Sequence, residues 1–246
     1  MTEGLYTAAS GMLAQTRNLE AIAGNLANLS TPGYKRDIPV FTSQLQDMLE
    51  DPLWFQTTHP EPTTQEIVEP DIAIDLTDGP LRRTDNPCDL ALQGPGFLVV
   101  QTDEGEAYTR SGALSLDSAG NLVTHSGRQI LGEGGPINVT GNTWGISPRG
   151  EVTVDGAITE QLQLVEIPAA SLQRIGDGLM LSDTAPEPLD WTETQVKQGF
   201  LEQSNANVMW EMVSLIAAMR TYEANQKMLQ VEDQTLGTAV NDVGQV

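Results

Sequence analysis

The two ends of this chain carry apolar residues that recur every seven positions, and this repeat limits the folds open to them. Near the N-terminus one row contains Leu5, Met12, Leu19 and Leu26, and a second row, three positions later, contains Ala8, Gln15, Ile22 and Leu29. This is the a/d pattern of helices that wind together as a coiled coil. It predicts an N-terminal helix that ends in the cap formers and Pro-Gly of residues 28–33.

The same repeat returns near the C-terminus. One row contains Val208, Leu215, Tyr222, Leu229, Leu236 and Val243, and the other contains Met212, Met219 and Val240, interrupted by Gln226 and Asp233. The residues expected to form the helix seam are Leu5, Met12, Leu19, Ile22, Leu26, Val208, Met212, Leu215, Met219, Tyr222 and Leu229. A single chain would leave about half of each seam exposed, so self-association is one interpretation. Packing of two helices within one globular domain explains the rows equally well.

Between the helices the sequence changes character twice. From Asp37 to Asp78 there are ten acidic residues, five prolines and no Lys or Arg, which predicts an extended connector with at most a short helix at Gln44–Glu50. From about Gly79 to Leu189 short alternating stretches lie between turns, as in a small all-β domain. Expected strands include 97–100 and 162–167, a hairpin formed by 113–116 and 121–124, and a second hairpin-like unit around Val152 and Val154.

These segments predict an α+β fold, in which N- and C-terminal helices pair as a coiled coil and a central all-β domain lies between them. The predicted boundaries are 1–33 for the N-terminal helix, 34–79 for the acidic proline-rich connector, 80–195 for the central β domain and 196–246 for the C-terminal helix.

The charge balance excludes several classes of partner. With 34 acidic and 12 basic residues the chain has a formal net charge of −22, so nucleic acid and acidic membrane surfaces are poor partners. The start of the chain lacks the pattern of a secretory signal, and no apolar stretch is long enough for membrane insertion. We therefore expect any export to use a route without a cleaved signal peptide.

The inventory for catalysis is poor. His59, His125 and the single cysteine, Cys88, are far apart in the sequence. No nucleophile elbow, phosphate-binding loop, dinucleotide fingerprint or zinc-ligand spacing is present in the sequence. We expect no enzyme activity and no catalytic, cofactor-binding or metal-binding residues.

Three blocks of the sequence follow one another in order along the chain. The first contains 5–12, 22–28 and 30–36, the second 89–97, 108–112 and 120–124, and the third 199–205, 212–213 and 220–227. Together they resemble the rod, hook and related axial proteins of the bacterial flagellum. The residues that match the family's motifs are Asn25, Asn28, Ser30, Thr31, Gly33, Tyr34, Ser204 and Asn205. Leu29 and Ala206 depart conservatively from the common pattern, which has valine at both places.

The resemblance implies a structural subunit of the flagellar basal-body rod, whose terminal helices form an axial core domain and transmit motor torque. The implied partners are copies of itself, other rod proteins and the flagellar type III export apparatus, and the implied location is the rod that spans the periplasm. The ending Asp233–Asn241 is most similar to proximal-rod members of the family, with distal-rod members as the alternative. A secreted, non-flagellar binding module on a helical stalk is a further alternative, and it predicts an apolar pocket among the strands.

Overall fold

The computed structural model describes residues 2–40, 71–103, 105–141, 143–189, 191 and 193–243, which divide into two compact units. Unit 1 takes in the described residues of Met1–Leu26, Asp37–Ala73 and Val208–Val246. Unit 2 takes in those of Ala27–Arg36 and Ile74–Asn207. The segments next to the two terminal helices therefore belong to the same unit as most of the strands.

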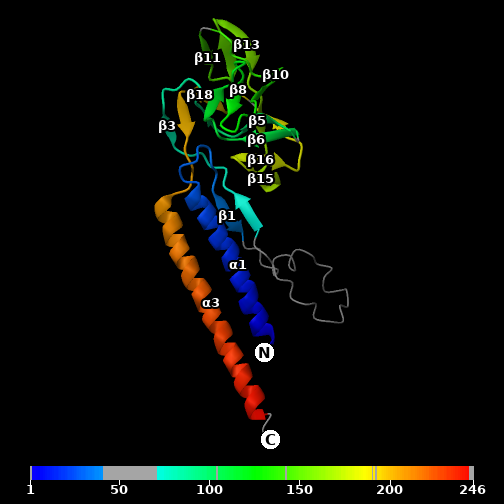
Figure 1. Ribbon diagram of the computed structural model, residues 1–246, viewed down its shortest axis with the longest axis vertical. Coiled ribbons are helices and arrows are strands. Elements are labelled where there is room, and N and C mark those ends of the chain that lie inside the picture. The colour runs from blue at the N-terminus through cyan, green and yellow to red at the C-terminus, as the bar shows by residue number, and fades with distance from the viewer. Residues whose placement is uncertain are drawn as a thin grey trace. The chain divides into compact units, whose positions relative to one another are not determined.

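Unit 1 contains two long helices, α1 (Thr2–Ala27) and α3 (Val208–Val243). They lie side by side and run in opposite directions (Figure 1). The helices approach closely at Gly11, where an added Cβ would lie 3.3 Å from Nδ2 of Asn225. A small residue on α1 therefore makes room for a polar side chain on α3 at this point.

Two short strands, β1 (Asp37–Val40) and β2 (Asp71–Ile74), pair as a two-stranded sheet. Asn25, near the end of α1, hydrogen-bonds to the backbone at the start of β1. Its Nδ2 donates to Asp37 O at 2.9 Å, and its Oδ1 accepts from Asp37 N at 2.8 Å. The donor and the acceptor of this buried side-chain amide therefore both pair with the backbone of Asp37, as the backbone of a neighbouring strand would.

The remaining strands and a short 3₁₀ helix, η2, lie in unit 2. They are β3 (Leu81–Arg83), β4 (Leu90–Gln93), β5 (Phe97–Thr102), β6 (Gly105–Thr109), β7 (Leu114–Leu116), β8 (Leu122–Thr124), β9 (Leu131–Gly132), β10 (Gly135–Pro136), β11 (Trp144–Ile146), β12 (Glu151–Val154), β13 (Ala157–Gln161), β14 (Leu164–Glu166), η2 (Ala169–Ser171), β15 (Leu172–Gly176), β16 (Leu179–Ser182), β17 (Glu187–Pro188), β18 (Gln195–Gln198) and β19 (Phe200–Glu202).

The main sheet has six strands in the order β15-β16-β6-β5-β14-β17. Its central pair, β5 and β6, is antiparallel, with Val99 opposite Tyr108. Residues 97–100 are buried on both faces of the sheet, which explains their continuous apolar run. Two hydrophobic clusters surround this sheet, one that includes Leu98 and Val100 and one that includes Phe97 and Val99.

Smaller antiparallel pairs bring late residues back to early ones. β18 pairs with β4, and β19 pairs with β3, so that Leu201 lies opposite Arg82. The hairpin of β7 and β8 closes through Asp117, whose Oδ1 accepts from the backbone N–H groups of Ala119 and Asn121 at 2.8 and 2.7 Å. The last strands before α3 thus complete the sheets begun at the start of unit 2.

The structure confirms the α+β class, both terminal helices and the expected strands at 97–100, 114–116, 122–124, 152–154 and 164–166. Compact unit 2 includes residues 27–36, 74–79 and 196–207 in addition to residues of 80–195, and the predicted domain boundaries remain a prediction. The helix expected at Gln44–Glu50 lies outside the described residues. Within the described parts, neither helix is sufficiently apolar over a membrane-spanning length to cross a bilayer.

Candidate functional site

A buried ion cluster in unit 2 joins the segment after α1 to the segment before α3. Lys35 follows the first helix, Arg110 follows β6, and Glu202 ends β19. Each of these three side chains is only 2% exposed. Charged side chains are rarely buried so deeply unless they are paired, so the pairing geometry decides whether this cluster stabilises the fold.

Glu202 uses both of its carboxylate oxygens. Its Oε1 accepts from Lys35 Nζ at 2.7 Å and from the backbone N–H of Gly79 at 2.8 Å. Its Oε2 accepts from Arg110 Nε at 2.6 Å. One carboxylate therefore pairs with cations from two distant segments and also satisfies a buried backbone donor.

The remaining donors of Arg110 bind backbone carbonyls and a second carboxylate. Its Nη2 donates to Asp78 Oδ1 at 3.0 Å and to the carbonyls of Gly94 and Leu92 at 2.6 and 3.3 Å. Its Nη1 donates to the carbonyl of Gly96. The fixed fork of the guanidinium thereby holds the loop between β4 and β5 against the cluster.

Lys35 is held from several sides. Besides Glu202, its Nζ donates to the carbonyl of Thr77 at 2.8 Å and lies 3.8 Å from Asp78 Oδ1. Burial, and then the positive charge of Arg110, lower the pKa of Lys35 below its ordinary value, while Glu202 and Asp78 act in the opposite direction. The ammonium therefore depends on its carboxylate partners to remain charged in this environment.

The backbone around Gly33 explains why the sequence needs glycine there. Gly33 has φ of 69°, and an added Cβ would lie 2.4 Å from the backbone carbonyl of Arg110. Its N–H donates to the carbonyl of Glu202 at 2.8 Å. Only a residue without a side chain allows the first segment to approach both other segments of the cluster this closely.

Asn205 fixes the chain just before α3. Its Oδ1 accepts from the N–H of Arg36 at 2.7 Å, and its Nδ2 donates to the carbonyls of Asp75 and Thr77 at 2.9 and 3.1 Å. The Arg36 side chain in turn donates from Nε to Asp75 Oδ2 at 2.8 Å. The amide thus bridges two segments that are about 130 residues or more from it in the sequence.

An aromatic contact adds to this junction, the place in unit 2 where the segment after α1 meets the segment before α3. The guanidinium carbon of Arg174, on β15, lies 4.4 Å from the centre of the buried Tyr34 ring, a distance that fits a cation–π contact. Arg174 also donates to the carbonyl of Lys35. The segment that follows α1 is therefore held against the edge of the six-stranded sheet.

The family-motif residues take different places in the structure. Gly33, Tyr34 and Asn205 meet at this junction, whereas Asn25 lies in unit 1 and hydrogen-bonds to Asp37. The turn after α1 contains Asn28, Ser30 and Thr31, and Thr31 Oγ1 donates to Asn28 Oδ1 at 3.1 Å. Ser204 is buried, and its Oγ accepts from the N–H of Ala206 at 3.2 Å.

The predicted seam of α1 lies on its covered face. Met12, Leu19 and Leu26 are half-buried, and Ile22 is buried. Leu5 falls among the residues whose side chains are not described. The half-buried Gln15 shares this face, so one polar residue interrupts its apolar rows.

The covered face of α3 is a stripe with alternating steps of four and three residues. Its buried or half-buried members are Glu211, Leu215, Ala218, Tyr222, Asn225, Leu229 and Glu232, while the other residues of 208–235 are exposed. Leu215, Tyr222 and Leu229 of the predicted seam are in this stripe. Val208, Met212 and Met219 are outside it, so their role in a seam remains a prediction about assembly.

The exposed part of α3 is strongly apolar near its start. Val208, Met209, Met212, Val213, Ile216 and Met219 each expose between 47% and 76% of their surface. Single exposed apolar residues are common on protein surfaces, but six within twelve positions form a continuous face. The polar residues Glu223, Gln226 and Gln230 follow on the same side of the helix.

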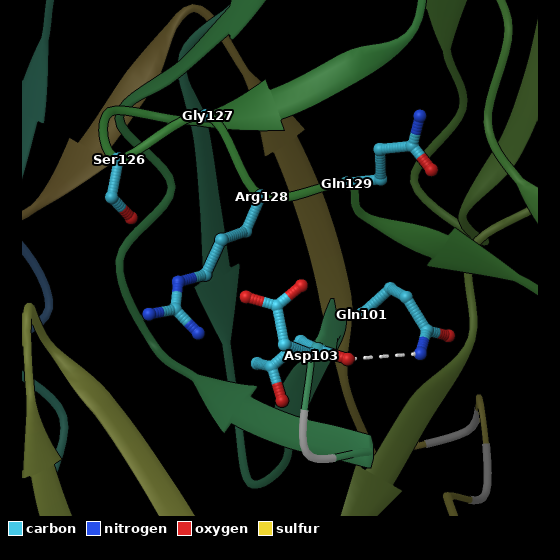
Figure 2. A pocket seen from close by; sticks show the side chains of 7 residues that line it. Gln101, Asp103, Ser126, Gly127, Arg128 and Gln129 are labelled. Carbon is cyan, nitrogen blue, oxygen red and sulfur yellow. Dashed lines mark hydrogen bonds between the residues drawn. The ribbon is translucent and has the colours of Figure 1, made fainter.

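A polar hollow of about 460 Å³ lies between the turn after β5 and the turn after β8. Figure 2 shows Asp103 and Arg128 facing it from opposite walls, with Gln101 and Gln129 alongside. A more apolar hollow of about 350 Å³ lies by β14 and β17 and includes Leu164, Leu189 and Trp191. Both are open at the surface, and neither contains a paired nucleophile and base.

The residues considered for catalysis do not come together in the described structure. His125 is exposed, and His59 lies outside the described residues. Burial and the neighbouring Asp89 raise the pKa of the Cys88 thiol, which lowers its reactive thiolate fraction. Among the described residues no group of His, Cys, Asp and Glu is arranged to hold a metal ion.

Lys35, Arg110 and Glu202 lie in the blocks that resemble the flagellar family, but the sequence motifs do not identify them as partners. A signal was available, because the chain has only 12 basic residues and five of them, Lys35 and Arg110 included, lie in blocks that resemble the family. The third block contains Glu202 directly after the apolar residues Phe200 and Leu201. Opposite charges in separate motif blocks indicate an ion pair between those blocks.

Comparisons with known proteins agree with this division of the chain. Residues 5–35 match the family described as "Flagella basal body rod protein", and residues 91–154 match "Flagellar hook protein FlgE/F/G D1 domain". Residues 197–242 match "Flagellar basal body rod FlgEFG protein C-terminal". The matched ranges include Lys35, Arg110 and Glu202.

Curated relatives are similar along the whole length. The flagellar basal-body rod protein FlgF of Caulobacter vibrioides is 32% identical over 259 residues, with 100% of both chains covered. FlgF of Escherichia coli is 32% identical, with 97% of both chains covered. The rod protein FlgG of Buchnera aphidicola subsp. Schizaphis graminum is also 32% identical, with 96% of this chain and 98% of the relative covered.

We predict that Glu202→Gln lowers the free energy of unfolding of unit 2 by about 3–5 kcal/mol, because it removes the buried carboxylate that Lys35 and Arg110 share and leaves them only the half-exposed Asp78. The matched control is Asp85→Asn, which breaks an ion pair with Arg83 whose side chains are 70% and 71% exposed. It should cost about 1 kcal/mol or less. Denaturant unfolding followed by tryptophan fluorescence measures both, and equal losses would contradict the assigned role of Glu202.

Asp75 should make the fold sensitive to acid. Burial alone would raise its pKa, but hydrogen bonds from Arg36 and Thr77 outweigh burial and hold the pKa below the ordinary 3.8. The folded chain then binds fewer protons than the unfolded chain, so this stabilisation is complete above pH 3.8 and is lost as the pH falls through the lowered pKa. The stability difference between the natural chain and Asp75→Asn should therefore shrink below pH 3.8; a constant difference would refute this.

Proposed function

This chain belongs to the flagellar basal-body rod protein family, and we propose that it is a structural subunit of the proximal rod, of the FlgF type. Its place is the flagellar basal body. In the proposed role it assembles with copies of itself and with other rod proteins through its terminal helices. The assembled helices form an axial core that transmits motor torque.

The observation that carries this proposal is the exposed apolar face of α3. In the single chain the covered stripe includes Glu211, Asn225 and Glu232, whereas the exposed face is made of Val, Met and Ile side chains. A helix that exposes its more apolar side gains free energy when another surface covers it. Helices of neighbouring subunits are the surfaces that a rod supplies.

The pairing of α1 with α3 supports the same proposal. Leu215, Tyr222 and Leu229 repeat every seven residues on the covered face of α3, and Met12 and Leu19 do so on α1. The approach of Gly11 to Asn225 places the two faces next to each other. We propose that the pair winds as a coiled coil and that each pair is the repeating unit of the axial core.

The ion cluster of unit 2 suits a part that bears torque. Residues 27–36 and 200–207, which adjoin the two helices, are held together by Glu202 and Asn205. A buried, charge-assisted network is stiff because every partner is fixed by several bonds. In the proposed role, force applied to the segment next to one helix is transmitted to the segment next to the other.

Replacing an exposed apolar residue of α3 with a charged one tests the assembly face. Ile216→Glu should leave the monomer folded, since this side chain is 54% exposed, but should abolish motility because rods fail to assemble. Gln226→Glu, on the polar continuation of the same side, should leave motility intact. Motility and electron microscopy of basal bodies measure the outcome, and normal rods with Ile216→Glu would overturn the proposed interface.

Deleting the gene tests the position in the rod. If the chain is the FlgF type, basal bodies isolated from the deletion strain should retain only the first subunits of the proximal rod and lack the rest of the rod. If it is the FlgG type, the proximal rod should be complete and only the distal rod missing. Electron microscopy of the isolated basal bodies distinguishes the two, and complete rods would exclude both.

A further inference from the structure

The methionines of this chain are unevenly placed. Four of the eight lie on α3, and Met209, Met212, Met219 and Met228 expose 76%, 51%, 51% and 56% of their surface. Met180, in contrast, lies in the core of unit 2 and is 2% exposed. Since exposed thioethers are the ones that oxidants reach, α3 is the most oxidisable described part of the chain.

Three of these methionines lie on one side of the helix. Met209, Met212, Ile216 and Met219 are separated by steps of three, four and three residues, so they form a single stripe along α3. Val208 and Val213 flank this stripe. All of these side chains are apolar, and none of them has a hydrogen-bond donor.

We propose that Met209, Met212 and Met219 form an oxidation-sensitive modification site at which conversion to methionine sulfoxide prevents this chain from assembling. The oxidant is a peroxide. Each thioether sulfur attacks one peroxide oxygen, and a sulfur–oxygen bond forms as the O–O bond breaks. The proton on the attacked oxygen moves to the departing oxygen, which leaves as water when the peroxide is hydrogen peroxide. Sulfur loses two electrons and the peroxide gains them. The inference rests on the proposed function, in which this face is covered by another subunit.

Oxidation at these positions changes association more than folding. In the single chain the sulfoxide oxygens point into water, so the helix and unit 1 keep their stability. In an assembly the same oxygens are buried against apolar side chains without a donor, and an unpaired buried acceptor opposes association. One such oxygen raises the critical concentration for assembly by about tenfold or more.

The protein contains its own control for accessibility. Met180 is oxidised only when unit 2 unfolds, so an unmodified Met180 shows that the treated chain stayed folded. Met228 is exposed but lies off the stripe, nine residues beyond Met219. In assembled rods the stripe methionines are covered, so their oxidation becomes slower than in the free chain.

The full-length, unassembled chain is treated with hydrogen peroxide and compared with untreated chain. Mass spectrometry of its peptides locates the added oxygen, circular dichroism checks the helices, and sedimentation gives the critical concentration for assembly. We expect oxygen at Met209, Met212 and Met219 but not at Met180, unchanged helicity and a critical concentration about tenfold higher or more. Oxidised chain that assembles like untreated chain overturns the inference and leaves the proposed function standing.

Variants assign the effect to the stripe. The triple variant Met209→Leu, Met212→Leu and Met219→Leu should assemble normally and remain competent after peroxide, whereas Met228→Leu should stay sensitive. In cells, Met→Gln at the same three positions, which adds polarity as the sulfoxide does, should remove rods, while the triple Leu variant keeps them. Normal rods in the triple Gln variant overturn the inference even if the purified chain does not assemble alone, and failure of the triple Leu variant to resist peroxide overturns it too.

Discussion

The fold depends on the carboxylate of Glu202, near the end of unit 2, which holds two buried cations from the beginning and the middle of that unit. Lys35 is 167 residues away from it in the sequence and Arg110 is 92 residues away. Without this carboxylate the two cations would keep only the half-exposed carboxylate of Asp78, and a buried charge that loses its buried partner costs several kcal/mol. The three segments are therefore coupled: the residues after α1, the end of β6 and the residues before α3 must be in place together.

This constraint fixes the short segments of unit 2 that adjoin the terminal helices. The segments next to both helices are built into unit 2 through Gly33, Tyr34 and Asn205, which the family resemblance had marked only as motif residues. Their role is explained by geometry: a close backbone approach, a stacked ring and an amide that bonds three backbone groups. Opposing forces act on the helices themselves, where an apolar face favours association and a net charge of −22 opposes it at long range.

Much of the fold could be predicted from local patterns. The seven-residue rows located both helices, continuous apolar residues located β5, and Asp117 with Gly120 located the turn between β7 and β8. The ion cluster could not be derived in this way, because its partners are separated by 92 and 167 residues and no local pattern connects them. In the sequence, Arg110 and Glu202 are each the single charged residue of a separate motif stretch, 108–112 and 199–205.

The sequence by itself determined the period of the helices, the α+β class and the family, since these follow from residue spacing and from motifs that survive in order along the chain. The tertiary structure decided which side of α3 is covered. In the single chain that side contains Glu211, Ala218 and Asn225, and Met212 and Met219 lie outside it. A heptad pattern fixes how often residues return to one side of a helix. Which side meets the partner helix depends on where the close contact forms, here between Gly11 and Asn225.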